Sequence, residues 1–270
     1  MIISIITPTY NSEKTIRLNI ESVLRQDFDD FEHIIVDNLS NDSTLEIIRD
    51  MYQKAGKQLK LRIISEKDQG ISDAFNKGIA FSRGQVIGIL NSDDFYFDDT
   101  VLKKTAIAFM NKDVLFTHGD VYFEDSVHGS NIRRPLLCPA EIAMPYNHPT
   151  MFFRREVYEK YGVFDLNFRY AMDYELVMRF EISEPGFQQK SFYIKGDPLV
   201  HVKSGGESWQ NEDKAISEIK SALKKNGLWN YNSRKSYYLR KTRNNVKKVL
   251  DKLGLQILVK YWRNWKWKNG

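Results

Sequence analysis

The stretch Ile2-Ile3-Ser4-Ile5-Ile6-Thr7-Pro8-Thr9-Tyr10-Asn11 decides the fold of the first half of the chain. The apolar run that ends at Ile6 predicts a buried strand, and the Thr7-Pro8 pair predicts the turn that ends it. Apolar residues then recur at helical spacing after Ser12, which we expect to cap a helix. A buried strand followed by a turn and an amphipathic helix is the opening of an α/β fold.

The same alternation continues along the chain. Further buried strands are expected at 33–36, 59–65 and 86–90, and helices at 42–51 and 72–84. Because strands that alternate with helices pair in parallel, we expect a Rossmann-like, mainly parallel central sheet with helices on both faces. The second half is less regular: strands are expected at 114–118, 120–124 and 150–153 and within 192–202, with helices from 155, at 173–182 and around 216–223.

The composition is that of a soluble globular protein. Of the 270 residues, 42% are hydrophobic and 28% are charged, which excludes intrinsic disorder. The single cysteine, Cys138, excludes an internal disulfide framework and indicates a reducing compartment. Neither a signal peptide nor a run of about 18 apolar residues is visible, so we expect a cytoplasmic protein without a membrane-spanning helix.

The net charge of +5 conceals two parts of opposite sign. Fourteen of the 40 basic residues and one of the 35 acidic residues lie in 224–270, which leaves 26 basic and 34 acidic residues in 1–223. The basic segment is also rich in aromatic residues: Trp229, Tyr231, Tyr237, Tyr238, Tyr261, Trp262, Trp265 and Trp267. Its apolar residues from Val246 onward can share one helical face, and Gly254 is a candidate hinge between two helices. This pattern is typical of an interfacial helix on an anionic membrane, while packing on the body or on a partner chain and nucleic-acid binding are the alternatives.

Polar or small residues follow each of the four strands expected in the first half. These segments run from Thr7 to Asn11, Asp37 to Asp42, Lys67 to Gly70 and Asn91 to Asp94. In an open α/β sheet, ligands bind beyond the carboxyl ends of the strands, which meet at one edge. Each segment alone is compatible with a turn or a helix cap, but four at one edge favour a binding crevice.

Asp93 and Asp94 carry the clearest chemistry at this edge. Two adjacent carboxylates at the end of an apolar strand repel each other, and a divalent cation would relieve that repulsion. Oxygen ligands suit Mg²⁺ or Mn²⁺, and Mg²⁺ completes its shell with water and substrate phosphates. The pair therefore predicts a diphosphate ligand, although an Asp-Asp pair taken alone is more often a solvated turn.

Together these motifs resemble glycosyltransferase family 2, whose members have the GT-A fold. The resemblance rests on Ser4 to Asn11, Ser22 to Gln26, Ile35 to Asn38, Asp73 to Gly78 and Leu90 to Asp94. It implies one transferase domain at 1–225, with a nucleotide-sugar half at 1–110 and an acceptor half at 111–225. A basic helical segment at 226–270 would follow it.

The resemblance also implies roles for single residues. Asp94 and then Asp93 would hold Mn²⁺ or Mg²⁺, with His201 as the further ligand that some relatives have. The nucleotide-sugar donor would be bound by Thr7, Pro8, Tyr10, Asp37, Asn38, Asp68, Asp73, Lys77, Ser92, Asp93 and Lys203. Gly205-Gly206 suggests a loop that closes over the donor phosphates.

Asp173, in Ala171-Met172-Asp173-Tyr174-Glu175-Leu176, matches the catalytic base of the family. An acceptor hydroxyl is a weak nucleophile until a carboxylate takes its proton, and a metal stabilises the leaving diphosphate. Attack opposite the leaving group inverts the anomeric carbon. A helix N-cap without chemistry is the alternative role for Asp173. His148-Pro149-Thr150 lies where acceptor contacts would be expected.

The sequence thus predicts a metal-dependent, inverting hexosyltransferase that uses a nucleotide-diphosphate sugar, by expectation a UDP-sugar. Similar proteins build bacterial surface polysaccharides such as O-antigens on polyprenyl-diphosphate lipids. That resemblance implies a lipid-linked glycan acceptor and a peripheral site on the inner face of the cell membrane.

Three alternative functions fit the sequence less well. A nucleotidyltransferase usually has a Gly-rich, basic phosphate loop, but Thr7 to Ser12 contains no Gly, Lys or Arg. A non-catalytic sugar-nucleotide binder would lack Asp173, and the acidic body argues against a nucleic-acid partner.

Overall fold

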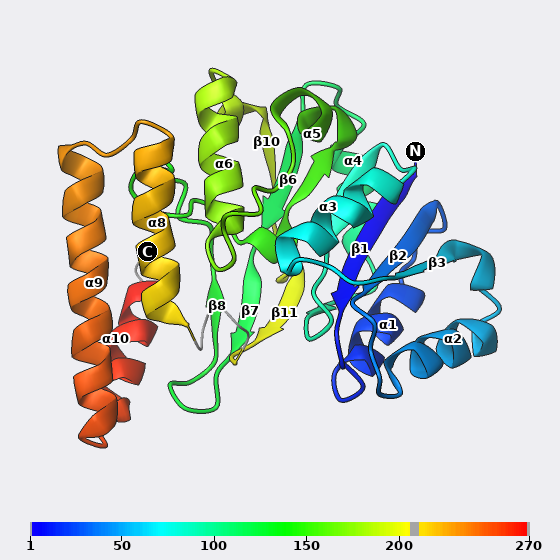
Figure 1. Ribbon diagram of the computed structural model, residues 1–270, viewed down its shortest axis with the longest axis horizontal. Helices are drawn as coiled ribbons and strands as arrows, with labels where there is room; N and C mark the ends of the chain where they lie inside the picture. Colours follow the sequence, from blue (N-terminus) through cyan, green and yellow to red (C-terminus); the bar gives the residue numbers. More distant parts are fainter. Residues whose placement is uncertain (1, 206–210, 269–270) are drawn as a thin grey trace.

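The computed structural model describes residues 2–205 and 211–268 and has a mixed α/β architecture (Figure 1). Its main sheet has seven strands in the order β10-β6-β9-β4-β1-β2-β3. Neighbouring strands are parallel except at β9, which is antiparallel to both β4 and β6. The bounds are β1 (Ile3–Thr9), β2 (Phe31–Asp37), β3 (Leu61–Ser65), β4 (Val86–Ile89), β6 (Phe116–Gly119), β9 (Phe152–Arg154) and β10 (Ser191–Ile194). The expected mainly parallel sheet is therefore confirmed.

A second, four-stranded sheet has the order β5-β11-β7-β8. Its bounds are β5 (Phe95–Tyr96), β7 (Val121–Glu124), β8 (Asn131–Arg133) and β11 (Val200–Lys203). Because β5 begins immediately after Asp94, this sheet starts at the carboxyl edge of the main sheet. The sequence pattern did not predict that these short strands form a sheet of their own.

Helices cover both faces of the main sheet. Their bounds are α1 (Ile16–Leu24), α2 (Thr44–Lys54), α3 (Ile71–Phe81), α4 (Val101–Ala108), α5 (Arg155–Tyr161), α6 (Met172–Ser183), α8 (Glu212–Lys225), α9 (Tyr231–Lys252) and α10 (Gln256–Lys268), with short 3₁₀ turns η1 (Gln58–Lys60), η2 (His148–Thr150) and η3 (Phe187–Lys190). Two predicted ends were wrong. Ser12 does not cap α1, which begins at Ile16, and the helix expected to end at Gly84 ends at Phe81.

The core is tightest where α3 crosses β1. Ile6 of β1 is fully buried, and a Cβ added to Gly78 of α3 would lie 2.3 Å from its Cγ2 atom. A Cβ on Gly88 of β4 would likewise lie 2.4 Å from the ring of Phe152 in β9. Only glycine permits such approaches without displacing a neighbour. The contact of Gly78 with Ile6 sets how closely α3 packs on β1.

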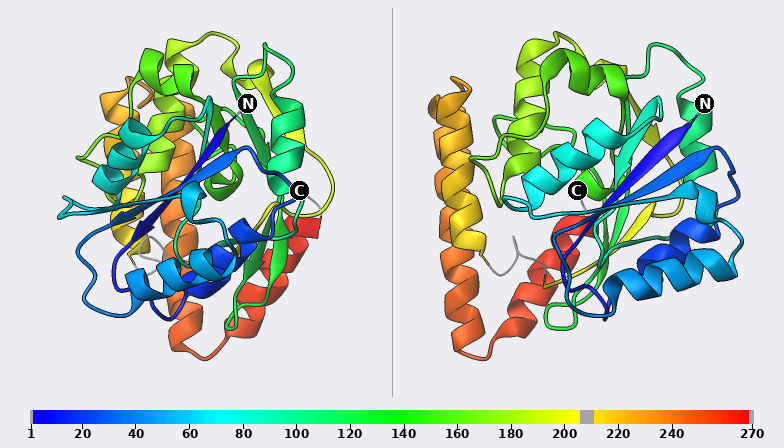
Figure 2. Two further views of the ribbon diagram at one scale, coloured as in Figure 1. Left: turned by 90° about the vertical axis from the view of Figure 1, so that its right-hand side faces the viewer. Right: turned by 45° about the vertical axis from the view of Figure 1, so that its right-hand side comes forward.

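The C-terminal helices form a separate layer beside the sheet. Helix α9 packs on α8, and α10 packs on α9 and on β8 (Figure 2). Gly254 separates α9 from α10 and has a φ of +72°, so the predicted hinge is present as a left-handed residue. In the described part of the chain, none of the helices is both long enough and apolar enough to cross a membrane.

Candidate active site

The acidic pair lies in the turn between β4 and β5. Asp94 is buried, with 3% of its surface exposed, whereas Asp93 is half-buried. Burial raises the pKa of Asp94 well above its usual value, and the neighbouring charge of Asp93 raises it further. Burial also raises the pKa of Asp93. Two carboxyls that are costly to ionise without a counter-ion favour binding of a cation.

Helix α1 holds this turn in place through Asn19. The Nδ2 of Asn19 donates hydrogen bonds to the carbonyl oxygens of Asn91, at 2.8 Å, and Asp94, at 3.0 Å. Ser12 Oγ lies 2.9 Å from Ser92 Oγ, which ties the turn after β1 to the same segment. Asn19 was missed in the sequence. Its only signal is a polar residue between the apolar positions Ile16 and Ile20, and that signal does not reveal its partners.

The donor atoms of this turn fit a divalent metal. Asn91 Oδ1 is buried and has no hydrogen-bond partner among the described residues, while Asn91 Nδ2 donates to Asp94 Oδ2 at 3.2 Å. An unpartnered oxygen beside two carboxylates is the hard-ligand environment that Mg²⁺ and Mn²⁺ prefer. Within 2–205 and 211–268 no group of three or more His, Cys, Asp or Glu residues is placed to hold an ion.

His201 and Lys203 lie on β11 next to the strand that continues from the acidic pair. His201 is paired with Phe95 across the β5–β11 ladder, and their rings lie 4.4 Å apart between centroids. His201 Nε2 lies 2.7 Å from Glu124 Oε2, and Lys203 Nζ lies 5.9 Å from the centre of the Phe95 ring. The metal-ligand role of His201 stays a prediction, and with Nε2 at Glu124 it would fall to Nδ1. Gly206, with the loop closure predicted for it, lies outside the described residues.

The turns after β1 and β2 are joined by Asp37. This carboxylate is fully buried and accepts hydrogen bonds from Thr9 Oγ1 at 3.1 Å, Ser65 Oγ at 2.7 Å and the backbone and side chain of Ser40. Thr7 is also fully buried, and its Oγ1 lies 2.9 Å from His33 Nε2. Both side chains therefore point into the protein, and their predicted donor contacts stay untested.

Three of the other predicted donor residues lie at the surface of the same edge. Tyr10 is 62% exposed, Pro8 is half-buried, and Asn38 accepts a hydrogen bond from the backbone N–H of Asp68 at 2.9 Å. The last contact brings the turn after β2 against the turn after β3. The structure thus brings the carboxyl ends of β1, β2 and β3 together, as the sequence pattern predicted.

The start of α3 presents a cluster of alternating charge. Asp68 accepts from the N–H of Gly70 at 2.8 Å, and burial raises the pKa of Asp68. Lys77 Nζ lies 2.9 Å from Glu66 Oε1 and 3.5 Å from Asp73 Oδ2. The hydrogen bond to Glu66 raises the pKa of Lys77, so its ammonium stays charged. A fixed cation beside the donor edge is suited to a phosphate.

Asp173 lies in the first turn of α6. Its Oδ1 accepts a hydrogen bond from the N–H of Tyr174 at 2.8 Å. The segment that leads into this helix is fixed by Glu218 of α8, whose carboxylate accepts from the N–H groups of Arg169 at 3.1 Å, Tyr170 at 2.7 Å and Ala171 at 2.9 Å. A carboxylate at a helix N-terminus also interacts favourably with the helix dipole. Glu218 was not predicted from the sequence.

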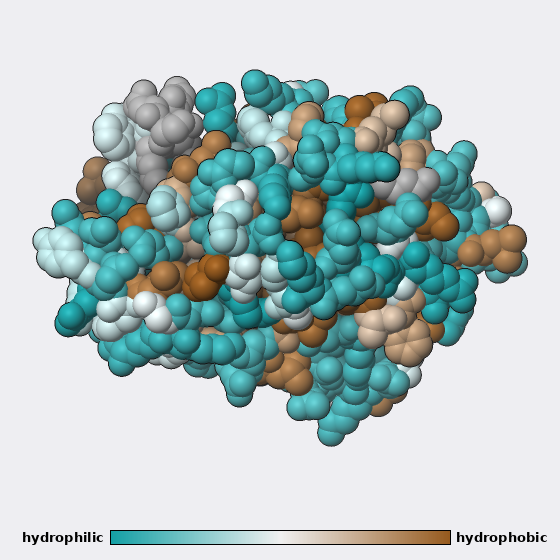
Figure 3. All heavy atoms as spheres, turned by 90° about the horizontal axis from the view of Figure 1, so that it is seen from above, coloured by the Kyte–Doolittle hydropathy of each residue, from teal (hydrophilic) through white to brown (hydrophobic). Residues whose placement is uncertain are grey.

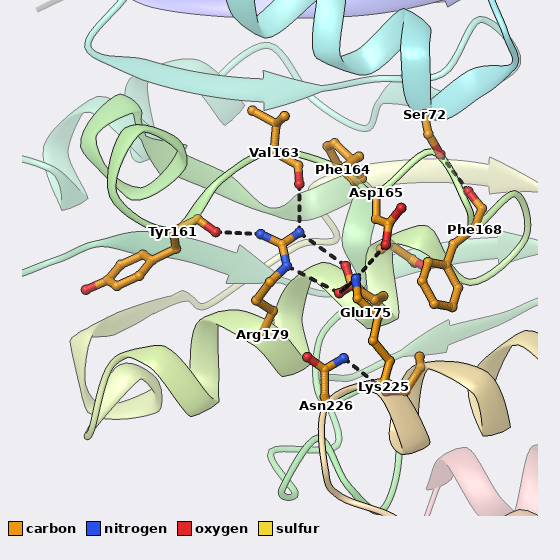
Figure 4. A network of polar contacts seen from close by, with 12 residues as sticks. Ser72, Tyr161, Val163, Phe164, Asp165, Phe168, Glu175, Arg179, Lys225 and Asn226 are labelled. Carbon is orange, nitrogen blue, oxygen red and sulfur yellow. Dashed lines mark hydrogen bonds and ion pairs between the residues drawn. The ribbon is translucent and has the colours of Figure 1, made fainter.

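A buried ion cluster anchors the same helix two residues further on (Figure 4). Glu175 is fully buried and accepts from Arg179 Nη2 at 3.1 Å and from Lys225 Nζ at 3.0 Å. Arg179 also donates to the carbonyl oxygens of Tyr161 and Val163, at 2.5 and 2.7 Å. The cluster ties α6 to α8 and to the segment after α5.

Helix α3 makes hydrogen bonds to the other side of the segment between α5 and α6. Ser72 Oγ donates to the carbonyl oxygen of Phe168 at 2.8 Å, as Figure 4 shows. Asn76 makes two hydrogen bonds to the backbone of Phe164, at 2.8 and 2.9 Å. The helix that begins at the donor edge therefore also positions the approach to Asp173.

The basic segment packs on the body through a buried polar cluster. Arg263 Nη1 lies 2.6 Å from Asp125 Oδ2, while His128 lies 3.2 Å from Asp125 and 3.0 Å from Asp251. Val259 is also buried. Packing on the body, one of the alternatives for this segment, therefore accounts for one face of α10.

Comparison with known proteins identifies the family. The model of glycosyl transferase family 2 matches residues 4–177. Chondroitin synthase of Escherichia coli is 29% identical over 262 residues, which cover 91% of this chain and 37% of that protein. Hyaluronan synthase of Pasteurella multocida is 30% identical over 245 residues, which cover 86% of this chain and 24% of that protein. The chain therefore spans well under half the length of both synthases.

Two solved structures show the same fold. S. aureus TarS in complex with UDP-GlcNAc has a TM-score of 0.65 at 18% identity, covering 83% of this chain and 66% of that chain. The mannosyltransferase PcManGT from Pyrobaculum calidifontis, in complex with GDP-Man and Mn²⁺, has a TM-score of 0.62 at 17% identity, covering 97% of this chain and 82% of that chain. The expected fold is the GT-A fold of these enzymes. This chain belongs to glycosyltransferase family 2.

Proposed function

We propose that this enzyme transfers a sugar from a UDP-sugar, with inversion, to a hydroxyl of a glycan acceptor that is carried on a lipid diphosphate. The observation that carries the proposal is that α3, which follows β3 at the carboxyl edge of the sheet, also holds the segment that leads to the second of two acidic sites. One is the buried Asp93–Asp94 turn, and the other is Asp173 at the start of α6, clamped by α3 and α8. The first suits a metal-bound diphosphate, and the second suits a general base.

In this proposal Asp94 and Asp93 hold Mn²⁺ or Mg²⁺, which supplies charge stabilisation for the departing diphosphate. Lys77 and Lys203 are the nearby cations suited to the phosphates. Asp173 accepts the proton of the acceptor hydroxyl as the oxygen attacks the anomeric carbon from the face opposite the diphosphate. The configuration at that carbon is inverted.

The choice of donor rests on relatives. Chondroitin and hyaluronan synthases are named for polysaccharides, and TarS was solved with UDP-GlcNAc, whereas PcManGT was solved with GDP-Man and Mn²⁺. UDP is therefore the donor nucleotide we propose, and GDP is the rival that a binding panel must include.

The proposed base is tested by substitution. Asp173→Asn should lower kcat for transfer by about 10²- to 10⁴-fold, because it removes the proton acceptor while leaving UDP affinity unchanged. Release of UDP is measured with a panel of UDP-sugars and p-nitrophenyl glycosides. Asp113→Asn, a change at an exposed carboxylate, is the matched control. Retention of wild-type kcat by Asp173→Asn would remove Asp173 from the mechanism.

We further propose that the C-terminal helices bind an anionic membrane and so bring the enzyme to its lipid-linked acceptor. Val259 and Arg263, four residues apart, are the buried face of α10. Ile257, Tyr261 and Trp265 are spaced in the same way but lie about 200° around the helix, and they are 54%, 69% and 66% exposed. These exposed apolar side chains thus lie on the side of α10 opposite Val259.

Helix α9 and the residue that follows it also carry exposed apolar side chains, and exposed basic residues lie nearby in the sequence. Val246, Val249 and Leu253 are 52%, 55% and 65% exposed. Lys252 and Lys260 are also exposed. Each basic residue near an anionic surface adds about 1 kcal/mol, and aromatic rings favour the headgroup level. In contrast, the face seen in Figure 3 is mostly hydrophilic, with hydrophobic residues in small separate groups.

Vesicle sedimentation tests the membrane proposal. The protein should bind vesicles that contain phosphatidylglycerol and should bind phosphatidylcholine vesicles at least tenfold more weakly. The double variant Tyr261→Ser/Trp265→Ser should lose most of that binding. A matched control, Leu59→Ser/Met110→Ser, removes two apolar side chains that are 102% and 80% exposed elsewhere. Equal binding by the two double variants would contradict the proposal.

A further inference from the structure

One histidine at the predicted site has no role in the proposed mechanism. His148 begins η2, and its ring lies 6.0 Å from the ring of Phe75 in α3 and 6.1 Å from that of Phe164. Within the described part of the chain, no group hydrogen-bonds to either ring nitrogen. The side chain is half-buried, so one side of it remains accessible.

The other histidines differ from His148 in partners or in access. His33, His128 and His201 each have an oxygen within 3.0 Å of a ring nitrogen. His118 has a buried Nδ1 without a partner, but only 1% of its surface is exposed, so no ligand can reach it. His148 thus combines unpartnered ring nitrogens with an open approach. A polar group placed in this way is suited to a ligand.

The turn that carries His148 is fixed on both sides. Asn147 Nδ2 donates to the carbonyl oxygens of Gly119 at 3.0 Å and Arg133 at 2.9 Å. Thr150 Oγ1 donates to the carbonyl oxygen of Asn147 at 2.7 Å and accepts from the N–H of Gly119 at 3.0 Å. A ring packed against the contacting rings of Phe75 and Phe164, on a turn fixed by hydrogen bonds, loses little conformational entropy on binding.

The ring lies within the electrostatic reach of Asp173. Burial lowers the pKa of His148, and the negative charge of Asp173 opposes that shift. The imidazole is therefore neutral at pH 7, with one N–H donor and one acceptor nitrogen. His148 packs against Phe164, which lies in the segment that leads to Asp173. Asn76 of α3 holds the backbone of Phe164 through two hydrogen bonds.

We propose that His148 hydrogen-bonds the acceptor sugar beside the hydroxyl that Asp173 deprotonates. This inference rests on the proposed role of Asp173 as base. The imidazole keeps its own proton throughout, since the hydroxyl proton passes to Asp173. Its contribution is to fix the acceptor between α3 and α6, so that the attacking oxygen faces the anomeric carbon.

The test compares transfer to a sugar with transfer to water. His148→Phe keeps a ring against Phe75 and Phe164 but removes both nitrogens. It should lower kcat/KM for the best p-nitrophenyl glycoside about tenfold to hundredfold, the loss expected for a hydrogen bond to substrate. Hydrolysis of the donor without acceptor should stay unchanged. His118→Phe, the matched change at the inaccessible histidine, should affect neither rate.

The other outcomes are decisive as well. Unchanged acceptor kinetics in His148→Phe would overturn the inference, and an equal fall in transfer and hydrolysis would assign His148 to the donor or to the fold instead. A second measurement needs no acceptor: in Asp173→Asn, proton NMR should show the pKa of His148 falling below its wild-type value. An unchanged pKa would separate the two groups and overturn the inference. Full activity of Asp173→Asn would refute Asp173 as the base, which is a failure of the proposed function. The effect of His148→Phe on transfer relative to hydrolysis would then be interpreted without Asp173.

Discussion

Replacing Glu175 by Gln tests whether the buried ion cluster supports the helix that carries Asp173. Glu175 is 0% exposed, whereas the side chains of its partners Arg179 and Lys225 are 21% and 46% exposed. Removing one member of a buried ion pair costs about 3–5 kcal/mol, because the partner charge is left uncompensated. Arg179 keeps two carbonyl partners and Lys225 keeps Asp165, so we expect the low end of that range. The free energy of unfolding should fall by about 3 kcal/mol.

Urea unfolding followed by circular dichroism at pH 7 measures this loss, provided the dependence on urea concentration is unchanged. Lys54→Met is the control, since it breaks an ion pair with Asp50 in which both side chains are well exposed, at 75% and 44%. That change should cost less than about 0.5 kcal/mol. In addition, Glu175→Gln combined with Lys225→Met should lose less than the sum of the two single changes. A loss below about 1 kcal/mol for Glu175→Gln would refute the argument from burial.

Three further substitutions test the packing and charge of the donor edge. Asp94→Asn should unfold at a higher temperature than wild type at pH 8 without metal and at the same temperature at pH 4. The reason is that Asp94 has a higher pKa in the folded chain than in the unfolded chain. Its ionisation therefore destabilises the wild type as the pH rises from the unfolded-state pKa toward the folded-state pKa. A melting temperature of Asp94→Asn below that of the wild type at pH 8 would contradict this. Asn19→Ala should lower the free energy of unfolding by about 2 kcal/mol and weaken Mn²⁺-dependent UDP binding, because the carbonyls of Asn91 and Asp94 lose their hydrogen-bond donor. Scanning calorimetry measures the first effect and titration calorimetry the second. Unchanged UDP affinity would contradict the role of Asn19 in holding the Asp93–Asp94 turn. Gly78→Ala should cost about 1–3 kcal/mol in urea unfolding through the collision with Ile6, and a neutral result would show that the α3–β1 contact can relax.

The sequence was sufficient to predict the parts of the fold that have a local signal. Apolar runs such as Ile2 to Ile6 and polar segments at strand ends predicted the first four strands and the edge on which they converge. Gly254 was recognisable as a hinge because a glycine between two amphipathic runs is the residue that adopts a positive φ.

Features that depend on distant partners were not predictable in this way. Asn19 reaches residues more than 70 positions away, and Glu218 caps a segment nearly 50 positions before it, so neither has a sequence signature. Ser12 was expected to cap a helix, but its hydroxyl contacts Ser92 instead, since a tertiary partner outweighs the local preference. In the basic segment, the helical spacing of apolar residues does not tell which of them are buried. The structure shows that Val259 is buried and Trp265 is exposed.

The most direct test of the account is calorimetric titration of UDP and GDP into wild type and Asp94→Asn, each with and without Mn²⁺. The account predicts that wild type binds UDP only when Mn²⁺ is present, that GDP binds more weakly, and that Asp94→Asn loses the Mn²⁺ dependence while remaining folded. Binding of UDP that is equally strong without Mn²⁺, or that survives unchanged in Asp94→Asn, would contradict the proposal that the Asp93–Asp94 turn holds a metal for the donor diphosphate.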